Sequence, residues 1–100
     1  MTFFACDLEA RAGRLARAYH VVVSKDLFGM IVVEVTFGRI GTVGRMLRFA
    51  EPEIGPARTK LRQVLLRRLS APHRLGTAYR CRQLYDPSGW LAADRLDFPA

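Results

Sequence analysis

Three evenly spaced glycines follow a long alternating segment, and this combination constrains the fold more than any other feature of the sequence. Residues 30–37 alternate with a period of two, which predicts a β-strand with one wholly apolar face. The inward side chains are expected to be Ile31, Val33, Val35 and Phe37. Residues 38–44 then carry a glycine at every third position, and glycine permits positive φ and close backbone approach. The sequence therefore predicts a tight hairpin here, with residues 45–50 as the returning strand.

Further elements are indicated on both sides of this hairpin. Residues 17–24 are rich in β-branched and aromatic side chains and predict a strand, residues 25–29 are typical of a turn, and residues 78–84 alternate again as a further strand. After Pro56 the period changes, and a basic amphipathic helix of about four turns is predicted before Pro72. Its apolar stripe is Leu61, Val64, Leu65 and Leu69, and its polar complement is Arg58, Lys60, Arg62, Arg67 and Arg68.

The two ends of the chain carry weaker signals. The first eighteen residues are expected to be irregular with a short helix, and Gly13 weakens such a helix by about 1 kcal/mol relative to alanine. The helical stripe there would be Leu8, Ala12, Leu15 and Tyr19. Residues 85–100 form a tail that is expected to fold back onto the body through Trp90, Leu91, Leu96 and Phe98.

Length and composition indicate one domain over residues 1–100, half of whose residues are hydrophobic. The expected fold class is α+β, an antiparallel sheet with one basic amphipathic helix packed on it. Cys6 and Cys81 stand alone, as expected of reduced thiols in a cytoplasmic protein. Neither a signal peptide nor an apolar run long enough to span a membrane is evident, so no membrane partner is expected.

Positive charge is concentrated in the second half of the chain. Residues 39–82 hold eleven basic side chains and two acidic ones, a local net charge of +9 in a chain of net charge +7. Such a distribution favours a polyanionic partner. The alternative is that arginine, which supplies fourteen of the sixteen bases, serves only solubility.

The hairpin sequence resembles the signature of the WGR domain, a module of DNA-dependent poly(ADP-ribose) polymerases and of small bacterial proteins. Residues 37–44 read Phe-Gly-Arg-Ile-Gly-Thr-Val-Gly, against Trp-Gly-Arg-Ile-Gly-Thr-x-Gly in that family. A second anchor is Asp-Leu-Phe-Gly at residues 26–29, and Tyr19 and Tyr79-Arg80 also look familial. With the order of elements, the resemblance covers about residues 3–84. Two positions depart from the family, since Phe37 replaces the tryptophan and lacks its indole donor, and Ile31 replaces an aromatic residue.

The resemblance implies a DNA contact at Phe37 and Arg39, because the signature Trp and Arg of family members lie there. The expected nucleic-acid-binding set is Phe37, Gly38, Arg39, Arg45, Arg48, Arg58, Arg62, Arg80 and Arg82. Phe37 is either a packing residue or a platform for a base or sugar. Arg39 either bonds its own loop or an acid, or contacts phosphate or a partner. The helix bases form a phosphate-binding surface only if they face the same way as Arg39, Arg80 and Arg82.

Enzymatic activity is not expected. His20 and His73 have no carboxylate or cysteine at a telling spacing, and the acids form no metal-ligand or paired-carboxylate motif. The glycine pattern is neither a dinucleotide fingerprint nor a P-loop, so no cofactor and no metal are expected. Two functions remain: a module that binds nucleic acid, DNA more than RNA, through its backbone or at an end or break, or an adaptor that docks an acidic protein partner. The oligomeric state is left open.

Overall fold

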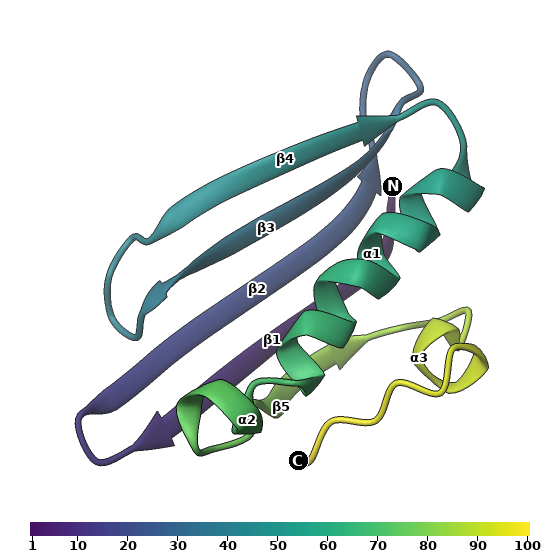
Figure 1. The fold of residues 1–100 in the computed structure, drawn as a ribbon. Coiled ribbons are helices and arrows are strands. Elements are labelled where there is room, and N and C mark those ends of the chain that lie inside the picture. The colour runs from purple at the N-terminus through teal and green to yellow at the C-terminus, as the bar shows by residue number, and fades with distance from the viewer.

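A five-stranded antiparallel sheet, with one long helix lying across one of its faces, makes up most of the structure (Figure 1). The computed structural model describes residues 1–100, and the strands lie in the order β4-β3-β2-β1-β5. The elements are β1 (Thr2–Ala12), β2 (Leu15–Lys25), β3 (Ile31–Arg39), β4 (Arg45–Glu51), α1 (Ile54–Leu69), α2 (Pro72–Leu75), β5 (Arg80–Tyr85) and α3 (Trp90–Ala93). The α+β class and the antiparallel sheet with its basic helix are thus confirmed.

The expectation for the N-terminal residues was wrong, because they form the long strand β1, which lies inside the sheet between β2 and β5. Side chains of β1 alternate, and its inward set is Phe4, Cys6, Leu8 and Ala10, each at most 3% exposed. Ala12 pairs with Leu15, so Gly13 and Arg14 form a two-residue hairpin in which Gly13 has a φ of 58°. Gly13 therefore serves as a turn residue.

The remaining elements follow the predicted order with shifted ends. β2 begins two residues earlier than expected and β3 continues through Gly38 to Arg39. α1 begins at Ile54, so Pro56 lies within its first turn, where a missing N–H costs nothing. β5 begins at Arg80, two residues later than expected.

The glycines of the β3–β4 hairpin allow two backbone segments to approach closely. A Cβ atom on Gly38 would lie 2.9 Å from the Cα of Gly44. A Cβ atom on Gly44 would lie 2.6 Å from the carbonyl oxygen of Phe37, at a φ of +75°. Gly41 also has a positive φ, but no atom lies near its missing side chain. Gly38 and Gly44 are therefore required because a side chain at either position would clash with backbone atoms. Gly41 is required only because the turn needs a positive φ there.

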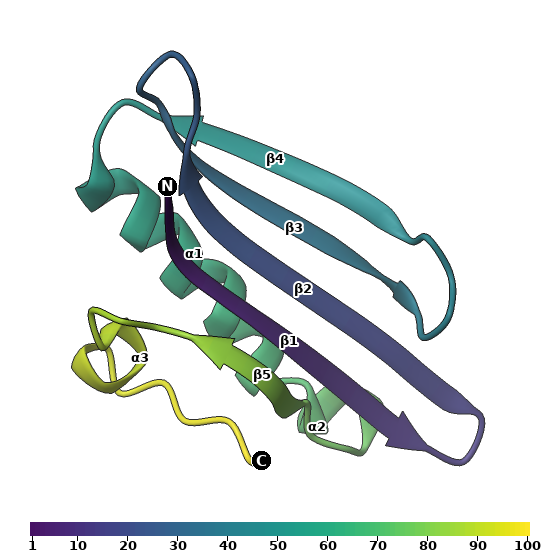
Figure 2. The same cartoon turned by 180° about the vertical axis from the view of Figure 1, so that it is seen from behind.

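The core lies between α1 and one face of the sheet. Ala57, Leu61 and Leu65 of the helix are at most 2% exposed and belong to one cluster with the inward residues of β1, β2 and β3. The opposite face of the sheet carries no helix (Figure 2). Because a helix covers only one face of the sheet, apolar and polar side chains alternate along the strands, with the apolar ones on the covered face.

The C-terminal tail packs onto the same cluster. Trp90 and Leu96 are buried, and the Trp90 ring stacks on Phe4 with 6.2 Å between ring centroids. Asp86 accepts hydrogen bonds from the backbone N–H groups of Trp90 and Leu91 at 2.8 and 3.0 Å. The end of the tail lies along β5, where the Cys81 N–H donates to the Pro99 carbonyl at 2.7 Å. The tail thus covers the β5 margin of the sheet.

The buried thiol of Cys6 gives the protein a predicted sensitivity to alkali. Burial raises the pKa of Cys6 from its usual 9.0 to about 12. Between these two pH values the unfolded chain has lost a proton that the folded chain retains, so the free energy of unfolding should fall by about 1.4 kcal/mol per pH unit. We expect urea unfolding between pH 9 and 11 to show this contribution to the slope, and we expect Cys6→Ala to remove it, leaving the smaller contributions of Cys81 and Tyr19, whose pKa values burial also raises. An equal slope in the variant would contradict the assignment.

Candidate nucleic-acid interface

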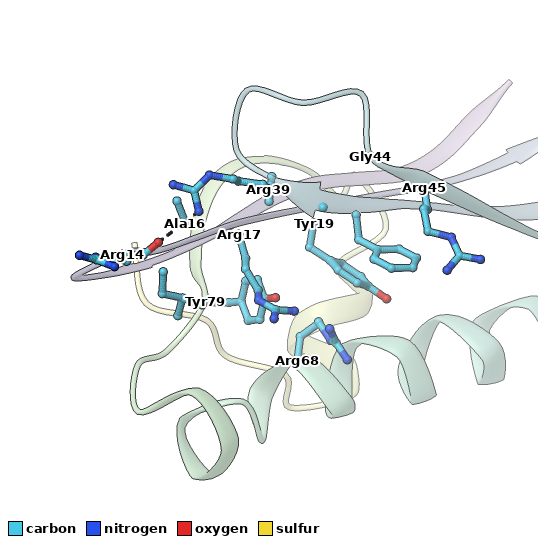
Figure 3. A pocket seen from close by; sticks show the side chains of 13 residues that line it. Arg14, Ala16, Arg17, Tyr19, Arg39, Gly44, Arg45, Arg68 and Tyr79 are labelled. Carbon is cyan, nitrogen blue, oxygen red and sulfur yellow. Dashed lines mark hydrogen bonds between the residues drawn. The ribbon is translucent and has the colours of Figure 1, made fainter.

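A cleft opens where the β1–β2 and β3–β4 hairpins overhang the C-terminal end of α1 (Figure 3). Its volume is about 440 Å³, and both hairpins, the adjoining ends of β2, β3 and β4, and α1 contribute to its walls. The lining residues are Arg14, Leu15, Ala16, Arg17, Ala18, Tyr19, Phe37, Gly38, Arg39, Gly44, Arg45, Arg68 and Tyr79. Five of these thirteen side chains are arginines and none is acidic, which makes the cleft strongly electropositive.

Three aromatic rings form the apolar part of the cleft. Tyr19 and Phe37 are directly paired on β2 and β3, and their rings stack with centroids 6.0 Å apart. Tyr79 meets Tyr19 edge to face at 6.1 Å and is 3% exposed. Phe37 is half-buried, so it packs against Tyr19 and also presents part of its ring to the cleft. Phe37 thus has the packing role that was one of its two expected roles, and the other role, a platform for a base or sugar, stays a prediction.

Four arginines come from the sheet and its hairpins. Arg17 and Arg39 are opposite each other on β2 and β3, and Arg45 is opposite Phe37 on β4. Like charges directly opposite each other on a sheet are destabilising. None of these residues, nor Arg14, forms an ion pair; the ion pairs of the protein involve other bases. Their mutual repulsion is therefore uncompensated in the free protein, and an anion in the cleft would relieve it.

The fifth arginine comes from the last turn of α1. The guanidinium carbon of Arg68 lies 4.6 Å from the ring centroid of Tyr19 and 5.8 Å from that of Tyr79. Stacking over these rings holds the planar group at the cleft without an acidic partner. Its Nε is buried and has no hydrogen-bond partner. Burial raises the pKa of Tyr19, opposed by the charge of Arg68, so the phenol stays protonated at neutral pH.

Arg39 is held by the neighbouring hairpin. Its Nη1 donates a hydrogen bond to the carbonyl of Arg14 at 3.2 Å (Figure 3), and its own carbonyl accepts one from the Thr42 hydroxyl at 2.7 Å. The side chain therefore binds the β1–β2 hairpin and not its own loop. A guanidinium has five N–H donors, so most of those of Arg39 stay free for a ligand.

The structure brings together only some of the residues expected in the site. Phe37, Gly38, Arg39 and Arg45 line the cleft. The others lie elsewhere, namely Arg48, Arg58, Arg62, Arg80 and Arg82.

Several of the bases outside the cleft lie beside acidic side chains. On the sheet face that carries no helix, Arg48 pairs with Asp26 and Glu34 at 3.8 and 3.9 Å, and Arg82 pairs with Glu9 at 3.7 Å. Arg80 is opposite Glu9 on β1 and donates to the Ala100 carbonyl at 3.0 Å. The helix bases therefore do not face the same way as Arg80 and Arg82.

Arg58 and Arg62, the two helix bases in the expected binding set, also lie outside the cleft. Arg58 pairs with Asp94 at 3.7 Å and lies 5.2 Å from the centroid of the Trp90 ring, so it fastens the tail to α1. Arg62 is exposed on the helix.

Sequence reasoning missed Arg14, Arg17 and Arg68 as members of the site. Both Arg14 and Arg17 belong to the β1–β2 hairpin; Arg14 lies in the segment expected to be irregular, and Arg17 begins the predicted strand of residues 17–24. The alternation of Phe4, Cys6, Leu8 and Ala10 with charged residues from Asp7 onward was the signal that would have placed them. Arg68 was recognised as a helix base, but only its contact with Tyr19 and Tyr79 separates it from its neighbours.

Other kinds of site receive little support. No group of three or more His, Cys, Asp or Glu side chains is arranged to hold a metal ion. None of the helices combines the length and the apolar character needed to cross a bilayer. His20 and Asp7 share a hydrogen bond on the face without a helix, at the opposite side of the sheet from the cleft. Comparison with protein-family models, with curated proteins and with solved structures gives no match to the chain.

Proposed function

We propose that the protein is a non-enzymatic module that binds nucleic acid in the cleft between its two hairpins. One observation carries the proposal: five arginines without acidic partners in their own chain surround an aromatic surface, whereas four of the nine arginines outside the cleft have ion-pair partners. A site of this composition suits a phosphate backbone, since guanidinium groups bind phosphate oxygens in a bidentate manner.

The contacts proposed for the cleft separate into two kinds. Arg14, Arg17 and Arg45 neutralise phosphates. A backbone carbonyl holds Arg39 in place and two aromatic rings hold Arg68. These two arginines therefore fix the orientation of the bound nucleic-acid strand. The exposed part of Phe37 offers an apolar contact to a sugar or base. Contacts of this kind recognise the backbone and do not distinguish base sequences. The proposed targets are therefore duplex DNA of any sequence, or its ends and breaks.

The hairpin sequence supports a relationship to the WGR domain as part of this proposal. Six of the seven specified residues of that signature are present, and the element order from β2 to β5 is the one that the resemblance implies. The substituted position, Phe37, lines the cleft beside Arg39. Free thiols at Cys6 and Cys81 support a cytoplasmic location.

A second candidate function, that of an adaptor for a protein partner, is favoured by the β2–β3 turn. Leu27 and Phe28 are 100% and 90% exposed there, although Asp26 fixes the turn by accepting hydrogen bonds from the Phe28 and Met30 N–H groups at 2.9 Å. Two adjacent apolar side chains exposed on a hydrogen-bonded turn offer such a partner an apolar contact. The tail does not provide this surface, because Trp90 and Leu96 are buried.

The two candidates are separated by a binding measurement. We expect fluorescence anisotropy to show binding of duplex, nicked duplex or single-stranded probes at low salt, with an affinity that falls steeply toward physiological salt. A preference for the nicked probe over intact duplex would assign the cleft to breaks, and RNA serves as the comparison for DNA. Absence of binding at low salt, or affinity unchanged by salt, would contradict the proposal. Purification with a defined protein partner and without nucleic acid would then favour the adaptor.

A further inference from the structure

The two outer strands of the sheet differ in how their free margins are covered. The margin of β5 carries the C-terminal tail, through the hydrogen bond from Cys81 to Pro99 and that from Arg80 to Ala100. The margin of β4 carries no element, since β3 is its only neighbour and α1 crosses the sheet face (Figure 1). A strand of seven residues therefore presents unpaired backbone N–H and C=O groups to solvent.

β4 also lacks two of the devices that commonly prevent strands from pairing at an edge, a proline and a bulge. It contains no proline, and its register against β3 runs from Arg45 to Glu51 without a bulge. Two of its apolar side chains, Met46 and Leu47, are 61% and 44% exposed. A straight, partly apolar edge of this kind is suited to receive another strand.

The sequence of β4 is complementary to itself in one antiparallel register. A two-fold axis through Arg48 places Arg45 of each copy opposite Glu51 of the other, and pairs all seven residues. Leu47 is then opposite Phe49, so apolar side chains meet on the face that bears α1. Registers centred on Leu47 or Phe49 leave two residues of each strand unpaired and oppose no acid to Arg45. We propose that a second copy of the chain occupies this edge, forming a dimer with one continuous sheet.

The only like charges that meet in this register are the two Arg48 side chains at the axis. Each already has two acidic neighbours in its own chain, Asp26 at 3.8 Å and Glu34 at 3.9 Å. These carboxylates offset the repulsion between the guanidinium groups. The same ion pairs therefore suit Arg48 to the centre of a symmetric interface.

The axis is perpendicular to the sheet, because residues directly opposite each other on antiparallel strands point to the same side. Both copies of α1 therefore lie on one face of the joined sheet, and both clefts open on that face.

The mass in solution tests the dimer itself. Sedimentation equilibrium of the full chain, treated with nuclease, should give twice the chain mass of 11.3 kDa at high protein concentration. Glu51→Arg opposes two arginines at each end of the interface and should weaken dimerisation at least tenfold. Arg45→Glu should do the same by opposing two acids, and the double exchange Arg45→Glu with Glu51→Arg should restore the dimer. A monomer at all concentrations would overturn the proposal, as would a double exchange that remains monomeric while its circular dichroism spectrum shows the wild-type fold.

Disulfide formation tests the register. Opposite residues of an antiparallel pair lie 4.5–5.5 Å apart at their Cα atoms, within reach of a disulfide. With Cys81→Ser as background, Arg48→Cys should form a covalent dimer under mild oxidation with copper phenanthroline. Met46→Cys, which this register places opposite Ala50, serves as the matched control and should remain largely monomeric on a non-reducing gel. Equal cross-linking of the two variants, or cross-linking of Met46→Cys alone, would overturn the register.

Discussion

Replacing Arg14 and Arg17 together by glutamine should weaken binding of a duplex probe at least tenfold at low salt. Both side chains line the cleft and neither has an acidic partner, so each is available to one phosphate. Glutamine keeps polarity and similar bulk but removes the charge, so two fewer counterions are released on binding. The slope of log affinity against log salt should therefore become shallower by about 0.9 per lost contact, or about 1.8 in total. Anisotropy titrations at four or five salt concentrations measure both quantities.

The matched control is the pair Arg62→Gln and Arg82→Gln. It lowers the net charge by the same amount, from +7 to +5, but at an exposed helix position and at a residue paired with Glu9. A binding site confined to the cleft predicts a much smaller change of affinity and slope in this variant. Equal losses in the two double variants would show that the overall positive charge attracts the nucleic acid and that the cleft has no special role. Thermal unfolding of both variants verifies that they fold.

Replacing Gly44 by alanine should destabilise the protein by about 3 kcal/mol or more. A left-handed residue costs about 1–2 kcal/mol when it carries a Cβ, and overpacking adds about 1–3 kcal/mol. The added methyl would lie 2.6 Å from the carbonyl oxygen of Phe37 and 3.1 Å from its carbonyl carbon, both of them backbone atoms that cannot rotate away. The two strands of the hairpin would have to separate. Urea unfolding followed by circular dichroism measures the difference.

Gly41→Ala provides the comparison for this variant. Gly41 has a φ of +88°, so alanine meets the same conformational cost, but no atom lies within 4 Å of the added methyl. We expect a loss of only about 1–2 kcal/mol there. A similar loss at both positions would mean that the hairpin relaxes without cost. Because Phe37 and Gly44 both line the cleft, folded Gly44→Ala should also bind nucleic acid less tightly than folded Gly41→Ala.

The central hairpin could be predicted because its local signals agree. The strict alternation of β3, the glycines after it and the change of period in α1 each admit one interpretation, and their order predicts an antiparallel sheet with a helix. The β1–β2 hairpin could not be predicted with the same reasoning, because Leu8, Ala12, Leu15 and Tyr19 also fit a helical stripe. Tertiary pairing decides between the two patterns, since β1 lies between β2 and β5 and gains backbone partners on both sides.

The site was harder to predict than the fold, because charge along the sequence says nothing about pairing in space. Arg48 and Arg45 are three residues apart on one strand, yet the first lies on the face without a helix beside two acids and the second lines the cleft. Alternation alone would have separated them, but it could not show that Asp26 and Glu34 lie close to Arg48. Likewise, Arg67 and Arg68 are neighbours in α1, and only the second lies over Tyr19.

The tail along β5 determines how far copies of this chain can assemble. A sheet grows by addition of further copies only if every subunit has two free edge strands, one that pairs with the preceding copy and one that pairs with the next. Here one margin is occupied by residues of the same chain, at Pro99 and Ala100. In the proposed dimer, association through β4 would therefore end after a single step, because the outer strand β5 of each copy lies beside its own tail. Residues 99 and 100 would then oppose growth of the sheet beyond two copies.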